Sequence, residues 1–222
     1  GTLCTQDAER MGWFMEVLRD KNLYFVDSMT TARSAAHAAA VAAGLGSLGV
    51  KKGDRVCILM ENSPEYYFAY LGIIRLGAIA GPVNCWWQTG EIQYLLNDSG
   101  AVALFFDHGY RAHIDRILDG TPALKHVIER EPADDRFLSF EKVMAEAAAP
   151  PPVRIDPDDV STIVYTSGTT GNPKGVVIKS TRTAMFAQLA PTLIWKYTPE
   201  TVIYTGLSLT HGNALAISLL PA

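Results

Sequence analysis

The segment with the clearest chemical character runs from Ser161 to Ser180 and reads STIVYTSGTTGNPKGVVIKS. Its centre combines four hydroxyl side chains with three glycines and one lysine. Glycines allow a chain to turn several backbone N–H groups inward as an anion-binding nest. Hydroxyl groups donate hydrogen bonds to phosphate oxygens, and a lysine adds a positive charge. We therefore predict a polyphosphate site formed by Thr166, Ser167, Gly168, Thr169, Thr170, Gly171 and Lys174.

This segment differs from a Walker A loop, which joins a strand to a helix and ends in Gly-Lys-Ser or Gly-Lys-Thr. Counted from Gly168, Pro173 occupies the place of the second glycine, and Lys174 is followed by Gly175. The β-branched runs on both sides, STIVY and GVVI, instead predict two strands joined as a hairpin. On these residues alone, a polar hairpin tip that binds no ligand remains an alternative.

The elements that must hold this hairpin alternate along the chain. Apolar spacing and helix propensity predict helices over residues 7–20 and 30–49. Capping residues predict a third helix that begins at Ser63-Pro64 and closes at Gly77, and a fourth that is capped by Thr89 and ends before Gly100. A fifth helix is expected from about Arg111. A further helix is expected over residues 137–149. Apolar runs predict strands within residues 51–60, 78–85, 101–106 and 126–129. Pro82 either limits the second of these strands or places it at an edge.

Strands that alternate with helices of this length are typical of an α/β fold with right-handed crossovers. The sequence therefore predicts a largely parallel sheet flanked by helices. Three prolines at positions 150–152 end the last of the upstream helices. We expect residues 1–150 to form an N-terminal α/β subdomain region, and residues 151–222 to begin a second α/β subdomain that carries the loop and is truncated.

Composition restricts the class of partner. The chain has 222 residues, a net charge of −4 and an apolar fraction of 48%, which fits a globular protein and gives no basic surface for nucleic acid. No apolar run reaches the length of a membrane span, and the first residues do not read as a signal peptide. Cys4, Cys57 and Cys85 are too far apart for a zinc site or a disulfide framework. We expect reduced thiols and a cytoplasmic location.

The string YTSGTTGNPKG resembles the phosphate-binding motif of the adenylate-forming superfamily, which includes acyl-CoA synthetases, peptide synthetase adenylation domains and luciferases. The run LGVKKGDRVCILMENSPEYYFAYLGIIRLGAIAGPVN is similar to the beginning of the first large subdomain of these enzymes. The strings YLLNDSGAVALFF and GLSLTHGNAL are similar to later family segments. The resemblance covers roughly Ala35 to the C-terminus and implies the N-terminal part of the large domain of an adenylate-forming enzyme.

The resemblance implies a reaction and a set of roles. A carboxylate attacks the α-phosphate of ATP to give an acyl adenylate and pyrophosphate, and coenzyme A then takes the acyl group. Residues 166–170 and Lys174 would hold the β- and γ-phosphates, and Thr166 would contribute a magnesium ligand. His211 would line the pocket of the small carboxylic acid substrate. Lys174 and His211 are the implied catalytic residues, and ATP, Mg²⁺ and coenzyme A are the implied cofactors.

Several features depart from the family pattern. Many relatives carry a histidine at the end of the strand after the loop, where this chain has Ser180, so that role is not carried over. In NCWWQTGEI, Trp86 and Trp87 could be exposed, could pack on another subdomain or could lie in the core. The family's Tyr-Gly-x-Thr-Glu string does not occur. We therefore expect a fragment that is inactive by itself and that self-associates through exposed apolar surface.

Two other functions stay open at this point. The first is an amino-acid adenylation domain of a peptide synthetase, although LSLTHGNALAISLLPA lacks the aspartate that would bind an α-amine, which favours a simple acyl substrate. The second is a non-catalytic module that binds nucleotide or a protein partner through the same loop.

Overall fold

The computed structural model describes residues 31–145, 153–166, 171–189, 196 and 207–216. The helix predicted over residues 7–20 lies outside these ranges. The strands are β1 (Arg55–Leu59), β2 (Ile79–Pro82), β3 (Ala103–Asp107), β4 (His126–Arg130), β5 (Leu138–Ser139), β6 (Val160–Thr166) and β7 (Lys174–Lys179). The helices are α2 (Thr31–Ser47), α3 (Pro64–Arg75), α4 (Thr89–Ser99), α5 (Arg111–Ile117), α6 (Phe140–Ala145), α7 (Ser180–Leu189) and α8 (Gly212–Ala214).

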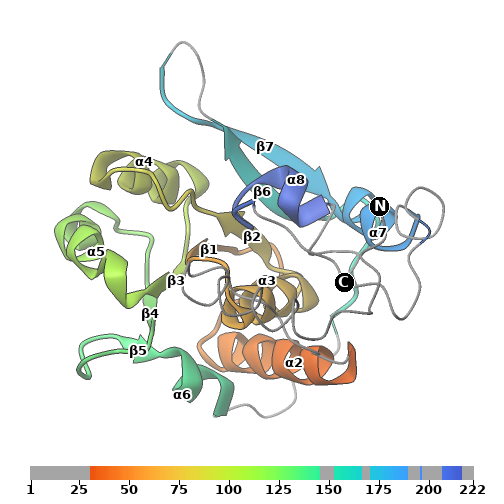
Figure 1. Ribbon diagram of the computed structural model, residues 1–222, viewed down its shortest axis with the longest axis horizontal. Coiled ribbons are helices and arrows are strands. Elements are labelled where there is room, and N and C mark those ends of the chain that lie inside the picture. The colour runs from red at the N-terminus through yellow and green to blue at the C-terminus, as the bar shows by residue number, and fades with distance from the viewer. Residues whose placement is uncertain (1–30, 146–152, 167–170, 190–195, 197–206, 217–222) are drawn as a thin grey trace, which may run out of the picture.

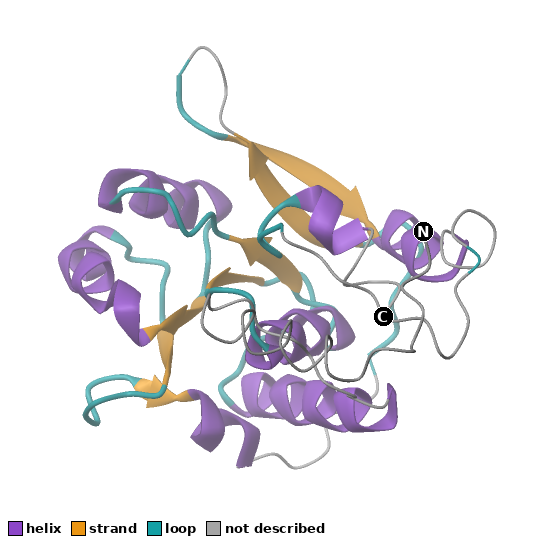
Figure 2. Ribbon diagram, in the orientation of Figure 1, coloured by secondary structure: helices purple, strands orange, loops and turns teal. Residues whose placement is uncertain are grey.

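The strands form one seven-stranded sheet in the order β5-β4-β3-β1-β2-β6-β7 (Figure 1). Each neighbouring pair from β5 to β6 is parallel, and only β6 and β7 are antiparallel. Helices lie against both faces of the sheet (Figure 2). The prediction of a largely parallel sheet flanked by helices is confirmed. The chain places β2 on one side of β1 and then returns to place β3 on the other, which makes a topological switch point at β1.

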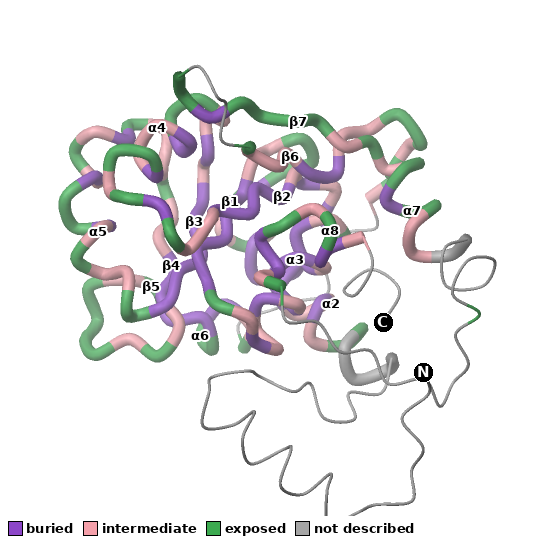
Figure 3. The backbone as a smooth tube through the Cα atoms, turned by 45° about the horizontal axis from the view of Figure 1, so that its top comes forward, coloured by how far each residue is buried: buried purple, intermediate pink, exposed green. Residues whose placement is uncertain are grey.

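The alternation of side chains along β1 explains the two faces of the core. Val56 and Ile58 pack with α2 and α3 in one buried cluster. Cys57 and Leu59 pack with α4 and α5 in the other. Because both faces are covered, the strand reads as a continuous apolar run, as parallel strands do. Figure 3 shows the buried strands at the centre with exposed helix surfaces around them.

Local capping signals hold in most places. Ser63 is the N-cap of α3 and its hydroxyl accepts from the Tyr66 N–H at 3.1 Å, as predicted. The predicted Thr89 cap is wrong by one residue: Gln88 is the N-cap of α4, and its N–H donates to the Glu91 carboxylate at 2.9 Å. Thr89 Oγ1 instead lies 2.8 Å from His113 Nδ1.

In the middle of the chain one expectation needs correction, and another is confirmed in one of its two alternatives. The helix predicted from Phe137 begins only at Phe140, because Leu138–Ser139 pair with β4 as the short strand β5. Pro82 ends β2, as one of the two alternatives stated, but β2 lies inside the sheet between β1 and β6 and not at an edge.

The division into residues 1–150 and 151–222 stays a prediction. β6 and β7 continue the sheet formed by the earlier strands, and the Tyr70 hydroxyl on α3 bonds the Thr162 hydroxyl on β6 at 2.8 Å. Within the described ranges no helix has the length and apolar character needed to cross a bilayer.

The packing of α2 on α3 depends on a glycine and gives a stability prediction. A Cβ on Gly72 would lie 2.6 Å from Val41 Cβ and 3.0 Å from the Ala38 carbonyl oxygen. We expect Gly72→Ala to lower the free energy of unfolding by about 1–3 kcal/mol, as overpacking does. Gly90→Ala, on an exposed helix turn with open space around it, is the matched control and should be neutral or stabilising by up to about 1 kcal/mol. If denaturant unfolding showed the same change in stability for Gly72→Ala and Gly90→Ala, the packing argument would be contradicted.

Candidate functional site

The predicted hairpin forms, with β6 and β7 as its two strands. Thr166 and Lys174 are a cross-strand pair at its outer end, and both side chains are exposed. β6 pairs with β2 at Ala80 and Thr162, near the start of β6, so its later residues extend past the sheet with β7 as a two-stranded ribbon. Figure 1 shows this ribbon reaching beyond the other strands. The hairpin therefore presents a hydroxyl and an ammonium group at one exposed end.

The tip of the hairpin is described in part. Gly171 has a φ of 139°, a conformation that favours glycine, and open space surrounds the position of its missing Cβ. Pro173 is buried directly before Lys174. The predicted phosphate ligands Ser167, Gly168, Thr169 and Thr170 lie outside the described residues.

His211 lies on a turn held by Asn62, which precedes α3, and by Tyr66 on α3. The Asn62 side chain donates to the Leu207 carbonyl at 2.9 Å and accepts from the Leu209 N–H at 2.7 Å. The Tyr66 hydroxyl donates to the Leu209 carbonyl at 2.9 Å. His211 then begins the short helix α8 as its N-cap, with an exposed side chain. Asn62 follows β1, so the turn that carries His211 is fixed over the carboxyl end of that strand.

The hairpin and the His211 turn share one edge of the sheet. β1, β2 and β6 are parallel, and their carboxyl ends therefore meet at the same edge. β2 separates β1 from β6, so these two strands lie about two strand spacings, or about 10 Å, apart across the sheet. Trp86 lies in the loop after β2, between them in strand order, and is 84% exposed, whereas Trp87 is buried against α4 and α5. In α/β sheets this carboxyl edge is where ligands bind.

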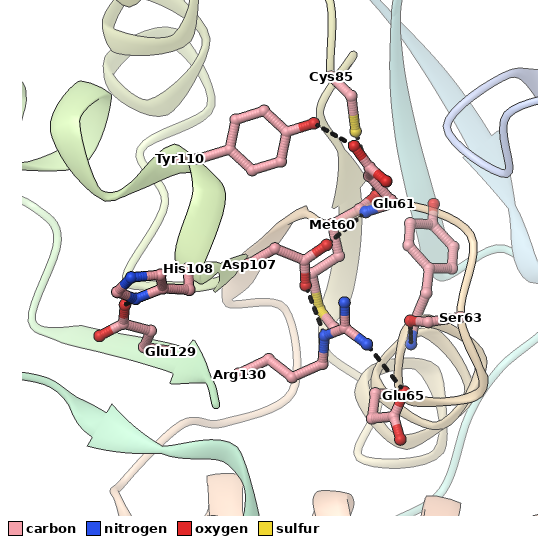
Figure 4. Close-up of polar contacts among 11 residues, drawn as sticks. Met60, Glu61, Ser63, Glu65, Cys85, Asp107, His108, Tyr110, Glu129 and Arg130 are labelled. Carbon is pink, nitrogen blue, oxygen red and sulfur yellow. Dashed lines mark hydrogen bonds and ion pairs between the residues drawn. The ribbon is translucent and has the colours of Figure 1, made fainter. Parts of the chain in front are cut away.

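A polar network lies at the same edge, after β1, β3 and β4 (Figure 4). Asp107 accepts from the Arg130 Nε–H and from the Glu61 N–H, at 2.7 and 2.8 Å. Arg130 also pairs with Glu65 at 3.4 Å. Burial raises the pKa of Asp107, while the Glu61 N–H and the Arg130 guanidinium act in the opposite direction. The network joins three strand ends to α3.

Glu129 belongs to the neighbouring part of this edge and is fully buried. One carboxylate oxygen lies 2.7 Å from His108 Nδ1, and the other lies 3.5 Å from an Arg111 nitrogen. Oε2 of Glu129 accepts no hydrogen bond from the described residues, but each carboxylate oxygen lies within ion-pair distance of His108 or Arg111. We therefore assign Glu129 to structure and not to catalysis.

Neither described cysteine has the character of a nucleophile. Cys57 is buried and Cys85 is half-buried, and both are free thiols, as predicted. Burial raises the pKa of Cys57 to about 12 and that of Cys85 to about 11. Since the thiolate is the reactive form, both are expected to be inert. Cys4 lies outside the described residues.

The donors at the hairpin fit an anion better than a bare metal ion. No acidic residue occurs between Ile163 and Val177 in the sequence. In the part of the chain that the structure describes, no group of three or more metal-binding side chains occurs. Magnesium is held by carboxylates together with phosphate oxygens of a substrate. The Thr166 hydroxyl could thus complete the shell of a magnesium ion that arrives with a polyphosphate, but could not bind the ion alone.

A parallel sheet with a glycine- and hydroxyl-rich hairpin at its carboxyl edge defines an α/β protein with a candidate phosphate-binding site. The chain belongs to the AMP-binding enzyme family, whose model matches residues 16–222. This membership confirms the resemblance to adenylate-forming enzymes that the sequence motifs indicated.

The chain is similar to several CoA ligases. It is 38% identical to 4-coumarate–CoA ligase 2 of Petroselinum crispum over 62% of this chain and 25% of that protein. It is 38% identical to a long-chain-fatty-acid–CoA ligase of Mycobacterium tuberculosis over 67% of this chain and 29% of that protein. The crystal structure of the anthranilate CoA ligase AuaEII with anthranoyl-AMP matches 77% of this chain and 33% of that one, with a TM-score of 0.70 and 28% identity. The matched part of this chain spans about a quarter of the length of these curated relatives.

Sequence reasoning missed Asn62 and Tyr66, which position the His211 turn. Asn62 could have been found from the sequence, because it follows a predicted strand, and functional polar residues of parallel sheets gather after the strand ends. Their partners, Leu207 and Leu209, lie about 145 residues further along the chain. No local pattern links positions so far apart.

Proposed function

We propose that the protein carrying this chain is an ATP-dependent acid–thiol ligase that forms an acyl adenylate and then an acyl-CoA. A carboxylate oxygen of the substrate bonds to the α-phosphorus of ATP, the bond from that phosphorus to the bridging oxygen breaks, and pyrophosphate leaves. The thiol of coenzyme A then bonds to the acyl carbon and AMP leaves. Catalysis of such transfers depends mainly on positioning and on stabilising the developing negative charge.

The pairing of Thr166 with Lys174 carries this proposal. Their register brings a hydroxyl and a positive charge to one end of the ribbon, where Gly171 adopts a positive φ that favours glycine. Lys174 and residues 166–171 would hold the leaving β- and γ-phosphates. A magnesium ion bound there would neutralise phosphate charge, with Thr166 as a ligand. His211, fixed over the carboxyl end of β1, would line the acyl pocket.

The relatives and the sequence together support a carboxylic acid as the class of substrate. The similar proteins named above are ligases for 4-coumarate, long-chain fatty acids and anthranilate, so a carboxylic acid is the shared chemistry. This supports an acyl-CoA synthetase over an amino-acid adenylation domain of a peptide synthetase. The lack of an aspartate between Leu207 and Ala222 points the same way.

ATP–pyrophosphate exchange tests the proposal. The full-length protein that carries this chain is assayed with aromatic acids, fatty acids of graded length and the common amino acids. We expect exchange with at least one carboxylic acid and with no amino acid. A folded protein that exchanges with none of them would contradict the ligase, and one that exchanges with amino acids would favour the peptide synthetase.

The 222 residues alone are proposed to bind polyphosphate without completing the adenylation, because their matched part spans only about a quarter of the relatives' length. Robust ATP–pyrophosphate exchange by the isolated chain would contradict the proposal that it cannot complete the adenylation.

A cytoplasmic location stays a prediction. Self-association also stays a prediction, and Val176 and Val177, which are 49% and 55% exposed on the edge strand β7, are the surface it would use.

A further inference from the structure

The outer half of the β6–β7 ribbon has little support from the sheet. Past Thr162, β6 has left its pairing with β2, and β7 is the last strand of the sheet among the described residues. A two-stranded ribbon by itself is at best marginally stable in water. A contact outside the ribbon would therefore stabilise the strand ends that carry Thr166 and Lys174.

Tyr165 supplies a contact of this kind. Its hydroxyl donates to Asp98 Oδ2 at 2.6 Å, which joins β6 to the end of α4. Across the described residues 163–166 and 171–178, it is the one side-chain hydrogen bond that reaches an element outside the hairpin and its flanking turn. The ring also packs against the buried cluster between the sheet and α4. Tyr165 thus ties the free part of the ribbon to the body of the domain.

On the opposite strand of the ribbon, a glycine leaves space for the Tyr165 ring. Gly175 is the cross-strand partner of Tyr165. A Cβ on Gly175 would lie 3.2 Å from Tyr165 Cζ and 2.9 Å from Ile163 Cγ2, so the ring covers the glycine. An aromatic ring over a glycine on the neighbouring strand is a known way to fix strand register. The ring therefore contacts the backbone of the residue next to Lys174.

Asp98 stands where helix electrostatics disfavour it. It lies in the last turn of α4, which ends at Ser99 and contains no basic residue in that turn. A carboxylate there faces the negative end of the helix dipole. Two tyrosine hydroxyls reach it, Tyr165 at 2.6 Å and Tyr94 at 3.5 Å. Burial and the nearby carboxylate raise the pKa of Tyr165, which keeps its hydroxyl protonated as a donor. The hydrogen bond from Tyr165 thus gives the Asp98 carboxylate a favourable contact at a helix end where a negative charge is otherwise disfavoured.

We propose that the Tyr165–Asp98 hydrogen bond is a positioning contact that fixes the β6–β7 hairpin on α4 and thereby sets the place of Thr166 and Lys174. Its effect on phosphate binding rests on the proposed function, whereas its effect on the hairpin does not. Tyr165 touches no reacting atom in this scheme and acts through the two residues that bind the phosphates.

Hydrogen exchange of the ligand-free chain tests the positioning directly. We expect Tyr165→Phe and Asp98→Ala each to speed exchange of the backbone amides of residues 174–177 by about tenfold, the effect of losing a hydrogen bond to a charged acceptor. The double variant should exchange no faster than either single variant, since one contact is lost in all three. Tyr94→Phe is the matched control, because it removes the longer bond to the same carboxylate within α4, and it should leave these amides unchanged.

A second measurement links the contact to the site. Calorimetric affinity for inorganic tripolyphosphate should fall about three- to tenfold in Tyr165→Phe, with an unchanged circular dichroism spectrum and no loss in Tyr94→Phe. Unchanged amide exchange in both Tyr165→Phe and Asp98→Ala, or additive effects in the double variant, would overturn the proposal. If the wild-type chain binds no tripolyphosphate, the proposed phosphate site fails, and the exchange comparison still decides the role of Tyr165.

Discussion

Replacing Lys174 with Ala is expected to weaken the binding of tripolyphosphate by about 10- to 100-fold, because a charge-assisted hydrogen bond contributes about 1.5–3 kcal/mol. In the full-length protein the rate of ATP–pyrophosphate exchange should fall by at least about 100-fold, the usual effect of removing a donor to developing charge. Lys174→Arg keeps the charge and should retain part of the affinity. Isothermal titration at two salt concentrations checks the first effect, and exchange kinetics check the second.

Lys179 provides a matched control on the same strand. It is exposed and pairs with Asp158 at 2.7 Å, at the opposite end of β7 from Lys174. Lys179→Ala removes the same charge from the same element but away from the hairpin tip, and a surface pair of this kind contributes little to stability. Tripolyphosphate affinity should stay within about twofold of the wild type. Equal losses in the two variants would mean that Lys174 acts only through net charge.

The local pattern of the sequence predicted much of this fold. The Ser63-Pro64 cap, the strand before Met60 and the hairpin around Gly171 each depend on neighbouring residues, whose preferences are readable from the chain. The short strand β5 was not predicted, because two residues carry no periodicity and pair only when β4 is already in place. The N-cap of α4 was missed by one residue because Thr is a preferred N-cap residue and Gln is not, whereas the Gln88 N–H donates to the Glu91 carboxylate three residues later.

The sequence predicted which residues form the candidate site, but not the contacts that hold those residues in place. Thr166 and Lys174 followed from the motif, whereas their tether to Asp98 crosses 67 positions. Asn62 likewise holds the His211 turn from about 145 positions away. Such contacts exist only after the sheet has assembled, so no pattern of neighbouring residues encodes them. The same is true of the network that includes Asp107 and Arg130, whose loss has the largest expected effect on stability.

Arg130→Met is expected to lower the free energy of unfolding by about 3 kcal/mol at neutral pH, since it leaves a mostly buried carboxylate without its cation. Asp107 is 7% exposed and retains only the Glu61 N–H in this variant. Adding Asp107→Asn makes the position neutral and keeps an acceptor for that N–H, so the double variant should recover much of the loss. Arg154→Met is the control: Arg154 is 90% exposed in its pair with Asp156, and its loss should cost less than about 0.5 kcal/mol.

The pH dependence of this loss identifies its cause. Burial already raises the pKa of Asp107 above its ordinary value of 3.8, and loss of the Arg130 guanidinium should raise that pKa further. An acid whose pKa is higher in the folded state than in the unfolded state binds its proton more tightly when folded. The penalty is therefore complete above the raised pKa and is relieved as the pH falls through it toward 3.8. Denaturant unfolding of Arg130→Met and wild type between neutral and acid pH should show the difference shrinking. A constant difference would mean that the cost comes from lost packing of the arginine side chain and not from the buried charge of Asp107.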